Sequence, residues 1–403
     1  MHQDPALPPR RFDLDWLRIL AFGLLILYHV GMYYVSWDWH VKSPFASATL
    51  EPLMLASSPW RLSLLFFVSG VATAYLLRRQ PTGFVASRAR RLLVPLLFGM
   101  LVIVVPQAYY EVVEKAGYAD GYLAFWQRYL LADPHFCRGN DCLRVPTWNH
   151  LWFVPYLFVY SLLLWALQRT APQGWLRLCD GLARRLSGWG LLLWPVLLLA
   201  LWRVLLVARF PATHDLVQDW YNHAQYLSMF GLGAALAFQS APWAALARWR
   251  WWALAGAVAS YAFIAWYFTV YAVGRAEVPD ALRMCQRLIY AANQWWTIAA
   301  ALGFARRWAP TDSPLRRYLT EAVFPFYIVH QSAIIVLAEQ LKPLRLPPAV
   351  EGPLLVLATA AVCGASFEAM RRVRWLRPLF GLAPQPALAA TADRRRPASI
   401  ASP

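Results

Sequence analysis

The sequence from Asp15 to Lys42 reads DWLRILAFGLLILYHVGMYYVSWDWHVK. Its apolar run is long enough to cross a membrane as one helix, with Arg18 in the first turn and His29 deeper inside. The two residues are eleven positions apart, which at about 100° per residue brings both side chains onto the same helix face. At about 1.5 Å per residue they lie roughly 16 Å apart along the axis, so Arg18 is near a membrane surface while His29 is well inside.

Polar side chains on a membrane helix are energetically unfavourable. An arginine in such a helix costs roughly 2.5–3.5 kcal/mol on insertion scales, so this face is expected to be hidden in a helix bundle. The default hypothesis for such residues is a functional site. The structural alternative is that Arg18 snorkels to the interface and His29 bonds a neighbouring carbonyl. Arg18 and His29 are therefore candidate catalytic residues.

The composition indicates a polytopic membrane protein. The chain has 403 residues, of which 59% are hydrophobic and 15% charged, and it contains 22 Trp. A soluble domain has about 25% charged residues. The formal net charge of +17 could suggest nucleic acid, but the arginines cluster in short loops between apolar runs, which is a topology signal. We expect no nucleic-acid partner.

The apolar runs predict an all-α bundle of about ten transmembrane helices. If both termini are cytoplasmic, the cytoplasmic segments hold more than twice as many Lys and Arg residues as the opposite loops, and this bias predicts that orientation. The predicted spans are 15–35, 59–77, 91–112, 150–168, 189–208, 222–239, 252–272, 288–304, 318–340 and 352–370.

One domain is expected, a transmembrane unit over 12–382. It lies between a cytoplasmic N-terminal tail, 1–11, and a Pro/Ala/Ser-rich cytoplasmic tail, 383–403, that is predicted to be disordered. No cleavable signal peptide is apparent, so the first span should be retained. A disulfide between Cys137 and Cys142 in the long outer loop stays open, because it depends on the compartment that the loop faces. No Cys pair or His cluster suggests a metal site.

Arginines mark both ends of the predicted bundle. The segment RARRLLVP places Arg88, Arg90 and Arg91 at the inner start of the third span, and Arg61 lies at the outer start of the second. Positive-inside topology alone would account for the three inner arginines. The functional interpretation is a clamp for phosphates, which Arg recognises bidentately.

Histidines occur in two further spans. His150 opens the fourth span, and Tyr327 and His330 are three residues apart, hence neighbours on one face of the ninth. The predicted depth of His330 is similar to that of His29. An imidazole in a water-poor site suits general base work, although a lone histidine is more often structural.

Two features have simple structural interpretations. Ser69-Gly70 in an apolar helix permits close helix approach, for which packing is the plainer reason. Glu368, near the end of the tenth span, can form an ion pair with Arg371 or Arg372.

These motifs together resemble the membrane acyltransferase-3 family over about residues 12 to 382. The resemblance rests on the Arg18-x10-His29 spacing and on FFVSG (66–70), RARRLLVP (88–95), HLWFV (150–154) and YIVH (327–330). Within the family, the chain most resembles members that succinylate periplasmic glucans. The stretches that support this are SWDWHVKS (36–43), YIVH, Arg61 eight residues before Ser69, and Glu368 with the basic end of the tenth span.

The resemblance implies transfer of an acyl group, succinyl before acetyl, from cytoplasmic succinyl-CoA or acetyl-CoA to hydroxyls of a periplasmic or surface glycan. The enzyme would be a multi-pass protein in the lipid bilayer of the bacterial inner membrane, with no permanently bound cofactor. A second protein, if one is needed to hand over the acyl group, would be a separate periplasmic partner.

The resemblance also implies roles for residues. His29 is the catalytic base or transient acyl acceptor, and Arg18 orients the donor or stabilises developing negative charge. His330 and Glu368 are further catalytic candidates. The residues expected to contact the donor's phosphates are Arg88, Arg90, Arg91 and Arg61.

Other function classes have less support. No nucleophile elbow, P-loop or dinucleotide fingerprint is present. A transporter of a glycan or a small anion would also bury Arg and His, but the discontinuous helices in matched halves that would favour it are not apparent. A non-catalytic scaffold does not explain why polar side chains are buried at such cost.

Overall fold

The computed structural model describes residues 11–271, 277–308 and 311–384. The predicted tails 1–11 and 383–403 lie almost entirely outside these residues.

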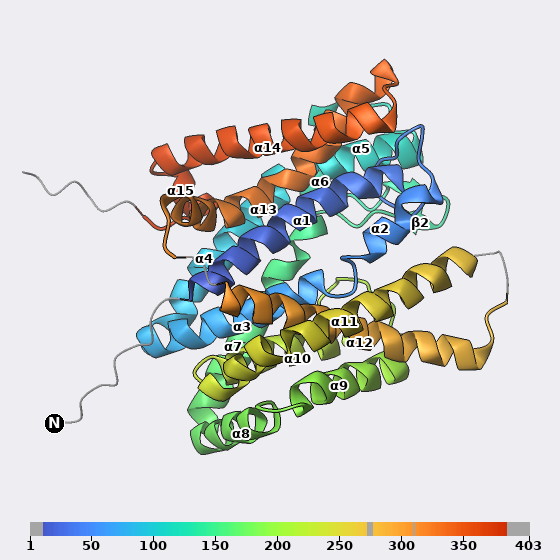
Figure 1. Ribbon diagram of the computed structural model, residues 1–403. Coiled ribbons are helices and arrows are strands. Elements are labelled where there is room, and N and C mark those ends of the chain that lie inside the picture. Colours follow the sequence, from blue (N-terminus) through green and yellow to red (C-terminus); the bar gives the residue numbers. More distant parts are fainter. Residues whose placement is uncertain (1–10, 272–276, 309–310, 385–403) are drawn as a thin grey trace, which may run out of the picture.

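The protein is a bundle of long helices that run side by side (Figure 1). The prediction of an all-α bundle is confirmed, and each predicted span falls on a helix. The long helices are α1 (Phe12–Tyr34), α3 (Arg61–Arg79), α4 (Phe84–Phe98), α5 (Val105–Ala116), α7 (Phe153–Thr170), α9 (Gly190–Leu206), α10 (Trp220–Leu236), α11 (Ser240–Val270), α12 (Asp280–Arg307), α13 (Pro314–Leu341) and α14 (Pro348–Arg372).

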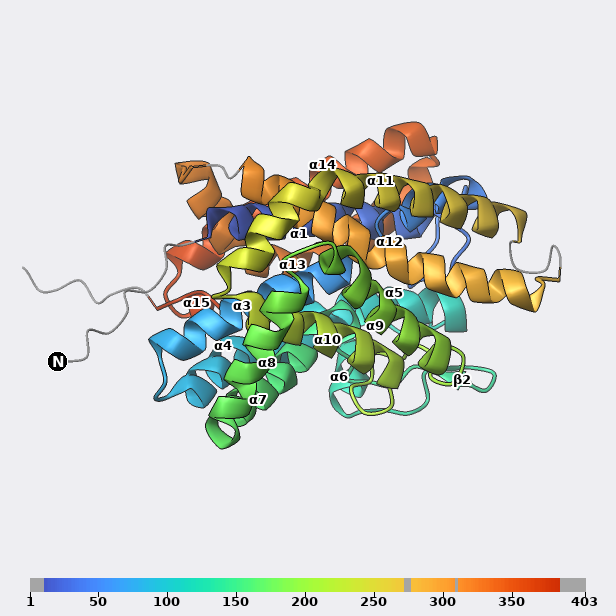
Figure 2. The same cartoon turned by 60° about the horizontal axis from the view of Figure 1, so that its bottom comes forward.

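The bundle is that of a multi-pass membrane protein. Within the described ranges, seven helical stretches are long and apolar enough to cross a membrane. The pair α8 (Pro172–Arg185) and α9, bent by 118°, makes eight if it forms one span. The number is below the predicted ten because α10 has 17 residues, fewer than the roughly 20 that a span needs, and because α12 contains several polar side chains. Figure 2 shows α8 and α9 in front of the bundle.

The predicted third span is two helices joined by a π-helical turn, Gly99–Ile103. The backbone N–H of Val104 donates to the Gly99 carbonyl at 2.8 Å, and Pro106 has no N–H to continue the helical ladder. A carbonyl released by the turn, that of Met100, accepts from the Tyr129 hydroxyl at 2.9 Å. The turn therefore anchors the loop that follows α5.

That loop folds back onto α5. It contains the short helices and strands α6 (Tyr122–Leu130), β1 (Cys137–Arg138) and β2 (Asp141–Cys142). The two strands pair antiparallel, and Cys137 is bonded to Cys142. Phe125, Tyr129 and Phe136 pack with residues of α5 in a separate buried cluster.

Helix α1 lies at the centre of the arrangement. It contacts α3, α12, α13 and α14. Near its end, Val30, Tyr33 and Tyr34 form a buried cluster with Ile334 and Leu355 from α13 and α14. Helix α1 begins at the same end of the bundle as α15 (Leu376–Leu379) (Figure 1). The described chain thus starts and finishes on one side.

Two glycines allow α3 and α10 to touch. A Cβ atom at Gly70 would lie 1.9 Å from the carbonyl oxygen of Phe230, and one at Gly233 would lie 2.0 Å from that of Phe67. Both contacts are with backbone, which cannot move aside as a side chain can. The close approach predicted for Gly70 is confirmed.

Replacing Gly70 with Ala should force these helices apart. We expect a loss of about 1–3 kcal/mol of stability, as is typical of overpacking, seen as a lower thermal unfolding temperature of the purified protein. Gly231→Ala on α10 is the matched control because nothing lies within 4 Å of its added Cβ. Equal unfolding temperatures for the two variants would show that the glycine contact is not needed.

Candidate functional site

Two histidines from distant parts of the chain face each other. His29 on α1 and His330 on α13 stack with their ring centroids 5.0 Å apart and an interplanar angle of 11°. Nδ1 of His29 lies 2.8 Å from Nε2 of His330. His330 is buried, whereas His29 is half-buried. The sequence predicts that these two residues lie at a similar depth, and in the structure a direct hydrogen bond joins them.

Backbone carbonyls of α13 fix the orientation of two imidazoles. Nδ1 of His330 lies 2.7 Å from the carbonyl oxygen of Tyr327. Nε2 of His150 lies 3.1 Å from the carbonyls of Tyr327 and Ile328. The Tyr327 hydroxyl in turn donates to the His150 carbonyl at 2.5 Å. Tyr327 therefore links His150 to the histidine pair.

A second polar branch reaches the same region from α5. Nδ1 of His40 lies 2.5 Å from Glu111 Oε2, and Gln331 Nε2 lies 2.9 Å from His40 Nε2. Gln331 also donates to Gln107 Oε1 at 3.1 Å, and Gln107 Nε2 lies 3.2 Å from His150 Nδ1. The buried polar groups are thus joined in one network, as an apolar interior requires.

The histidines His29, His40 and His150 line a cavity of about 440 Å³, which we call the histidine cavity. Much of the remaining wall is aromatic. Three tryptophans and several polar side chains face the same space; these residues are Trp39, Trp148, Trp152, Asp38, Thr147, Asn149, Thr213 and His214.

A buried carboxylate positions one wall of this cavity. Asp219, which is not exposed, accepts from the Tyr156 hydroxyl at 2.6 Å and from the His214 backbone N–H at 3.1 Å. The His214 ring stacks on Trp152 at 4.1 Å, and Trp148 Nε1 donates to the His214 carbonyl at 2.9 Å. Burial lowers the pKa of His214, which favours the neutral ring.

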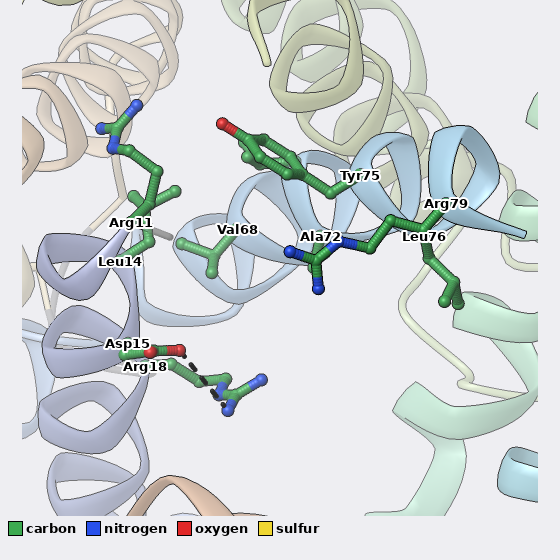
Figure 3. A pocket seen from close by; sticks show the side chains of 10 residues that line it. Arg11, Leu14, Asp15, Arg18, Val68, Ala72, Tyr75, Leu76 and Arg79 are labelled. Atoms are coloured by element: carbon green, nitrogen blue, oxygen red, sulfur yellow. Dashed lines mark ion pairs between the residues drawn. The ribbon is translucent and has the colours of Figure 1, made fainter. Parts of the chain in front are cut away.

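Arginines line two cavities near the start of α1. One, of about 320 Å³, is lined by Arg18, Arg88 and Arg91, and we call it the arginine cavity. Arg88 Nε donates to Ser161 Oγ at 3.1 Å. The other, of about 250 Å³ between α1 and α3, also includes Arg18, with Arg11 and Arg79 (Figure 3). Arg18 is thus part of both.

A thin partition separates the arginine cavity from the histidine cavity. Four side chains line both spaces: Phe22, Leu65, Phe153 and Tyr327. Helix α1 contributes Arg18 on one side, Phe22 in the partition and His29 on the other side.

Arg18 is held by its own helix and by α13. Its Nη2 lies 3.9 Å from Asp15 Oδ1 and donates to the Thr320 carbonyl at 3.4 Å. Asp15 also pairs with the buried Arg316, which Asp312 contacts at 2.5 Å. These contacts hold the guanidinium of Arg18 at the cavity wall.

Two of the arginines predicted to contact the donor lie elsewhere. Arg90 is exposed and does not line the arginine cavity. Arg61 is buried beside Tyr28, close to the histidine cavity, so it is separated from Arg88 and Arg91. The reason is that α3 starts at the end of the bundle where α1 finishes, whereas α4 starts at the opposite end.

Glu368 is also apart from the histidines. It accepts from the Tyr318 hydroxyl at 2.8 Å and pairs with Arg371 and Arg372 at 3.2 and 2.9 Å. These contacts favour the ion-pair interpretation over a catalytic one.

Sequence reasoning missed several members of the site. Glu111 and Gln107 are polar residues at the end of the predicted third span, which was a usable signal. Gln331 directly follows His330 inside the predicted ninth span and gave the same signal, whereas Asp219 lies outside every predicted span and gave none.

The residues that the structure describes contain no group of three or more His, Cys, Asp or Glu side chains arranged to hold a metal ion. The site is therefore built from hydrogen-bonded imidazoles, guanidinium groups and aromatic rings. An imidazole in a hydrogen-bonded network suits proton transfer, and a guanidinium cluster suits a phosphate or carboxylate.

Comparison with known proteins agrees with this chemistry. Residues 11–367 match the family model described as acyltransferase domain. Glucans biosynthesis protein C from Escherichia coli strain 536 is 27% identical over 168 residues, and that from strain K12 is 26% identical over 168 residues. The chain spans about two fifths of the length of these relatives, 41% in both cases. No solved structure matches the chain.

The family match covers most of the chain, including Arg18, His29, the arginine cavity's Arg88 and Arg91, and His330. The chain belongs to the acyltransferase-3 family.

Proposed function

We propose that this enzyme moves an acyl group, succinyl before acetyl, from a cytoplasmic acyl-CoA to hydroxyls of an extracytoplasmic glycan. In this proposal it lies in the bacterial inner membrane with both termini in the cytoplasm. The observation that carries the proposal is the meeting of the arginine cavity and the histidine cavity at a shared partition. A donor on one side and an acceptor on the other need such a meeting point.

The arginine cavity suits the donor. CoA carries phosphates, and arginine binds phosphate through charge-assisted, bidentate hydrogen bonds. Arg18, Arg88 and Arg91 supply three guanidinium groups in one space. Because Arg18 lies roughly 16 Å along α1 from His29, its place is with the donor's phosphates and not with charge developing near His29.

The histidine cavity suits a glycan acceptor. Its wall combines Trp39, Trp148 and Trp152 with polar groups such as Asn149. Flat aromatic rings offer large contact area, and a small number of polar groups fix orientation. The name of these relatives, glucans biosynthesis protein C, supports a glucan as the acceptor class.

The hydrogen bonds of the histidine pair assign their protons. A carbonyl oxygen only accepts, so Nδ1 of His330, beside the Tyr327 carbonyl, carries a proton. In a neutral ring Nε2 of His330 is then an acceptor, and His29 Nδ1 must donate to it. The lone pair of His29 therefore resides on Nε2, and His330 acts as a positioning residue.

This arrangement gives His29 the form of a general base. Its Nε2 takes the proton of an acceptor hydroxyl as the oxygen attacks the thioester carbonyl. The new C–O ester bond forms, the C–S bond breaks, and the imidazolium returns the proton to the departing thiolate. The same lone pair can instead accept the acyl group, which is the second form of the proposal.

Replacing His29 with Ala tests the reaction. Glycans from cells with the wild-type chain should carry the acyl mass increment, and glycans from cells with His29→Ala at equal protein level should lack it by mass spectrometry. His135→Ala is the control, because His135 is exposed and bonds Asp133.

The increment itself distinguishes a succinyl from an acetyl group. Retained acylation in His29→Ala would remove His29 from the mechanism. A small-molecule accumulation defect without any glycan change would favour a transporter instead.

Nuclear magnetic resonance can test the proton assignment. In protein labelled with nitrogen-15 histidine and held in lipid, we expect His29 to be protonated at Nδ1 and free at Nε2. His330→Ala removes the acceptor at 2.8 Å, so the tautomer preference of His29 should weaken. A proton on Nε2 of His29 in the wild type would contradict the assignment.

Glutamine variants of Arg88, Arg91 and the adjacent Arg90 test the proposed donor site. Arg88→Gln and Arg91→Gln should each raise KM for acyl-CoA about tenfold or more, since hydrogen bonds to charged groups contribute about 1.5–3 kcal/mol. Arg90→Gln should leave KM nearly unchanged, because Arg90 lies on the same helix but does not line the arginine cavity. An equal effect of all three would indicate a topological role for the cluster.

A further inference from the structure

Arg61 is a buried cation without an acidic partner. It is 3% exposed at the start of α3, and its Nη1 donates to Ser57 Oγ at 2.8 Å. Its Cζ atom lies 3.8 Å from the centroid of the Tyr28 ring. The Nε atom is buried, and none of the described residues accepts a hydrogen bond from it.

The other deeply buried arginines differ from Arg61. Of the arginines that the structure describes, Arg316 and Arg377 are also less than a tenth exposed. Arg316 pairs with Asp15 and Asp312, and Arg377 pairs with Glu321. Among the described residues, no carboxylate lies within 4.0 Å of a nitrogen of Arg61.

A second arginine shares the same surroundings. Arg203 on α9 has its Cζ atom 3.5 Å from the centroid of Tyr290, and its Nη1 donates to the Tyr221 hydroxyl at 2.8 Å. Its Nε is also buried without an acceptor in the described chain. Tyr290 lies within electrostatic range of both Arg61 and Arg203.

The carboxylate of this region is already occupied. Asp219 and Arg61 both act electrostatically on the buried Tyr226. The oxygens of Asp219 accept from the Tyr156 hydroxyl and the Asn222 side-chain amide. Asp219 is therefore not a counter-ion for either arginine.

A buried cation, Arg61, and a half-buried one, Arg203, without an acid partner are unfavourable in an apolar environment, where charges are paired or hydrogen-bonded. In both arginines an aromatic ring covers the face of the guanidinium, and this leaves N–H donors in its plane. Those in-plane donors are the ones that grip a carboxylate. The pair is suited to receive an anion.

The position of Arg61 beside the histidine cavity indicates which molecule supplies the anion. Tyr28, over which Arg61 lies, lines the histidine cavity and directly precedes His29. An anion at Arg61 lies next to the Tyr28 wall of that cavity, so this place suits the charged end of a group whose other end reacts near His29. A dicarboxylic acyl group has this form, with one carbonyl in the thioester and one free carboxylate.

We infer that Arg61 and Arg203 bind the free carboxylate of a dicarboxylic acyl group and select it over neutral acyl groups. This inference rests on the proposed function and names the residues that determine its acyl specificity. It also gives Arg61 a role apart from the donor's phosphates.

A binding experiment tests the inference without turnover. Purified protein is titrated with monomethyl succinate, which has an ester and a free carboxylate, and with methyl propionate, which lacks the carboxylate. We expect monomethyl succinate alone to raise the thermal unfolding temperature, because a ligand that binds the native state stabilises it. Inorganic phosphate is the third ligand and should have less effect.

Variants locate the site. Arg61→Gln and, independently, the half-buried Arg203→Gln should weaken this binding about tenfold or more. Arg169→Gln is the matched control, because Arg169 also lies over an aromatic ring, Trp165, but is exposed. His29→Ala should still bind the ester, so loss of transfer and loss of anion binding can be told apart.

Three results would overturn the inference. They are equal stabilisation by methyl propionate, stronger stabilisation by phosphate, and unchanged binding in both Arg61→Gln and Arg203→Gln. Binding that survives while no glycan is acylated would overturn the proposed function and keep the anion site.

Discussion

The hydrogen bond between His29 and His330 is the contact on which the site depends. It joins α1 to α13 inside an apolar bundle, where an unpaired imidazole nitrogen would be costly. The bond also transmits orientation. The Tyr327 carbonyl fixes the proton of His330 on Nδ1. Nε2 of His330 is then an acceptor, which fixes the proton of His29 on its Nδ1. Two successive hydrogen bonds thus link the ring of His29 to a backbone carbonyl of α13.

The second constraint is that one helix serves both cavities. Helix α1 places Arg18 in the arginine cavity and His29 in the histidine cavity, with Phe22 in the partition between them. In the proposed reaction the donor and the acceptor come from opposite sides of the membrane, and the two have to meet without a continuous pore opening. Four side chains at the partition are a short barrier, and the rest of the protein surrounds each cavity with its own polar groups.

Helical geometry explains what could be predicted. The eleven-residue spacing placed Arg18 and His29 on one face. Gly70 indicated close helix packing, and in the structure the backbone of Phe230 lies against it. The partners of these residues could not be predicted. The predicted topology already puts Arg61 and Arg88 at opposite ends, but their neighbours Tyr28 and Ser161 come from other helices, which the sequence does not indicate. Gln331 bonds His40, and Asp219 bonds Tyr156, across long stretches of the chain, and one sequence does not reveal such partners.

The arginines show how burial and pairing together separate structural from functional charge. Arg316 is buried more deeply than Arg61, but two carboxylates neutralise it and bind α1 to the start of α13. Removing one of those acids would leave an uncompensated buried charge, which is why such pairs persist. Arg61 is already in that uncompensated state, with an aromatic ring as its main contact. A fold keeps such a group at a cost to its own stability, and a ligand that supplies the missing charge removes that cost when it binds.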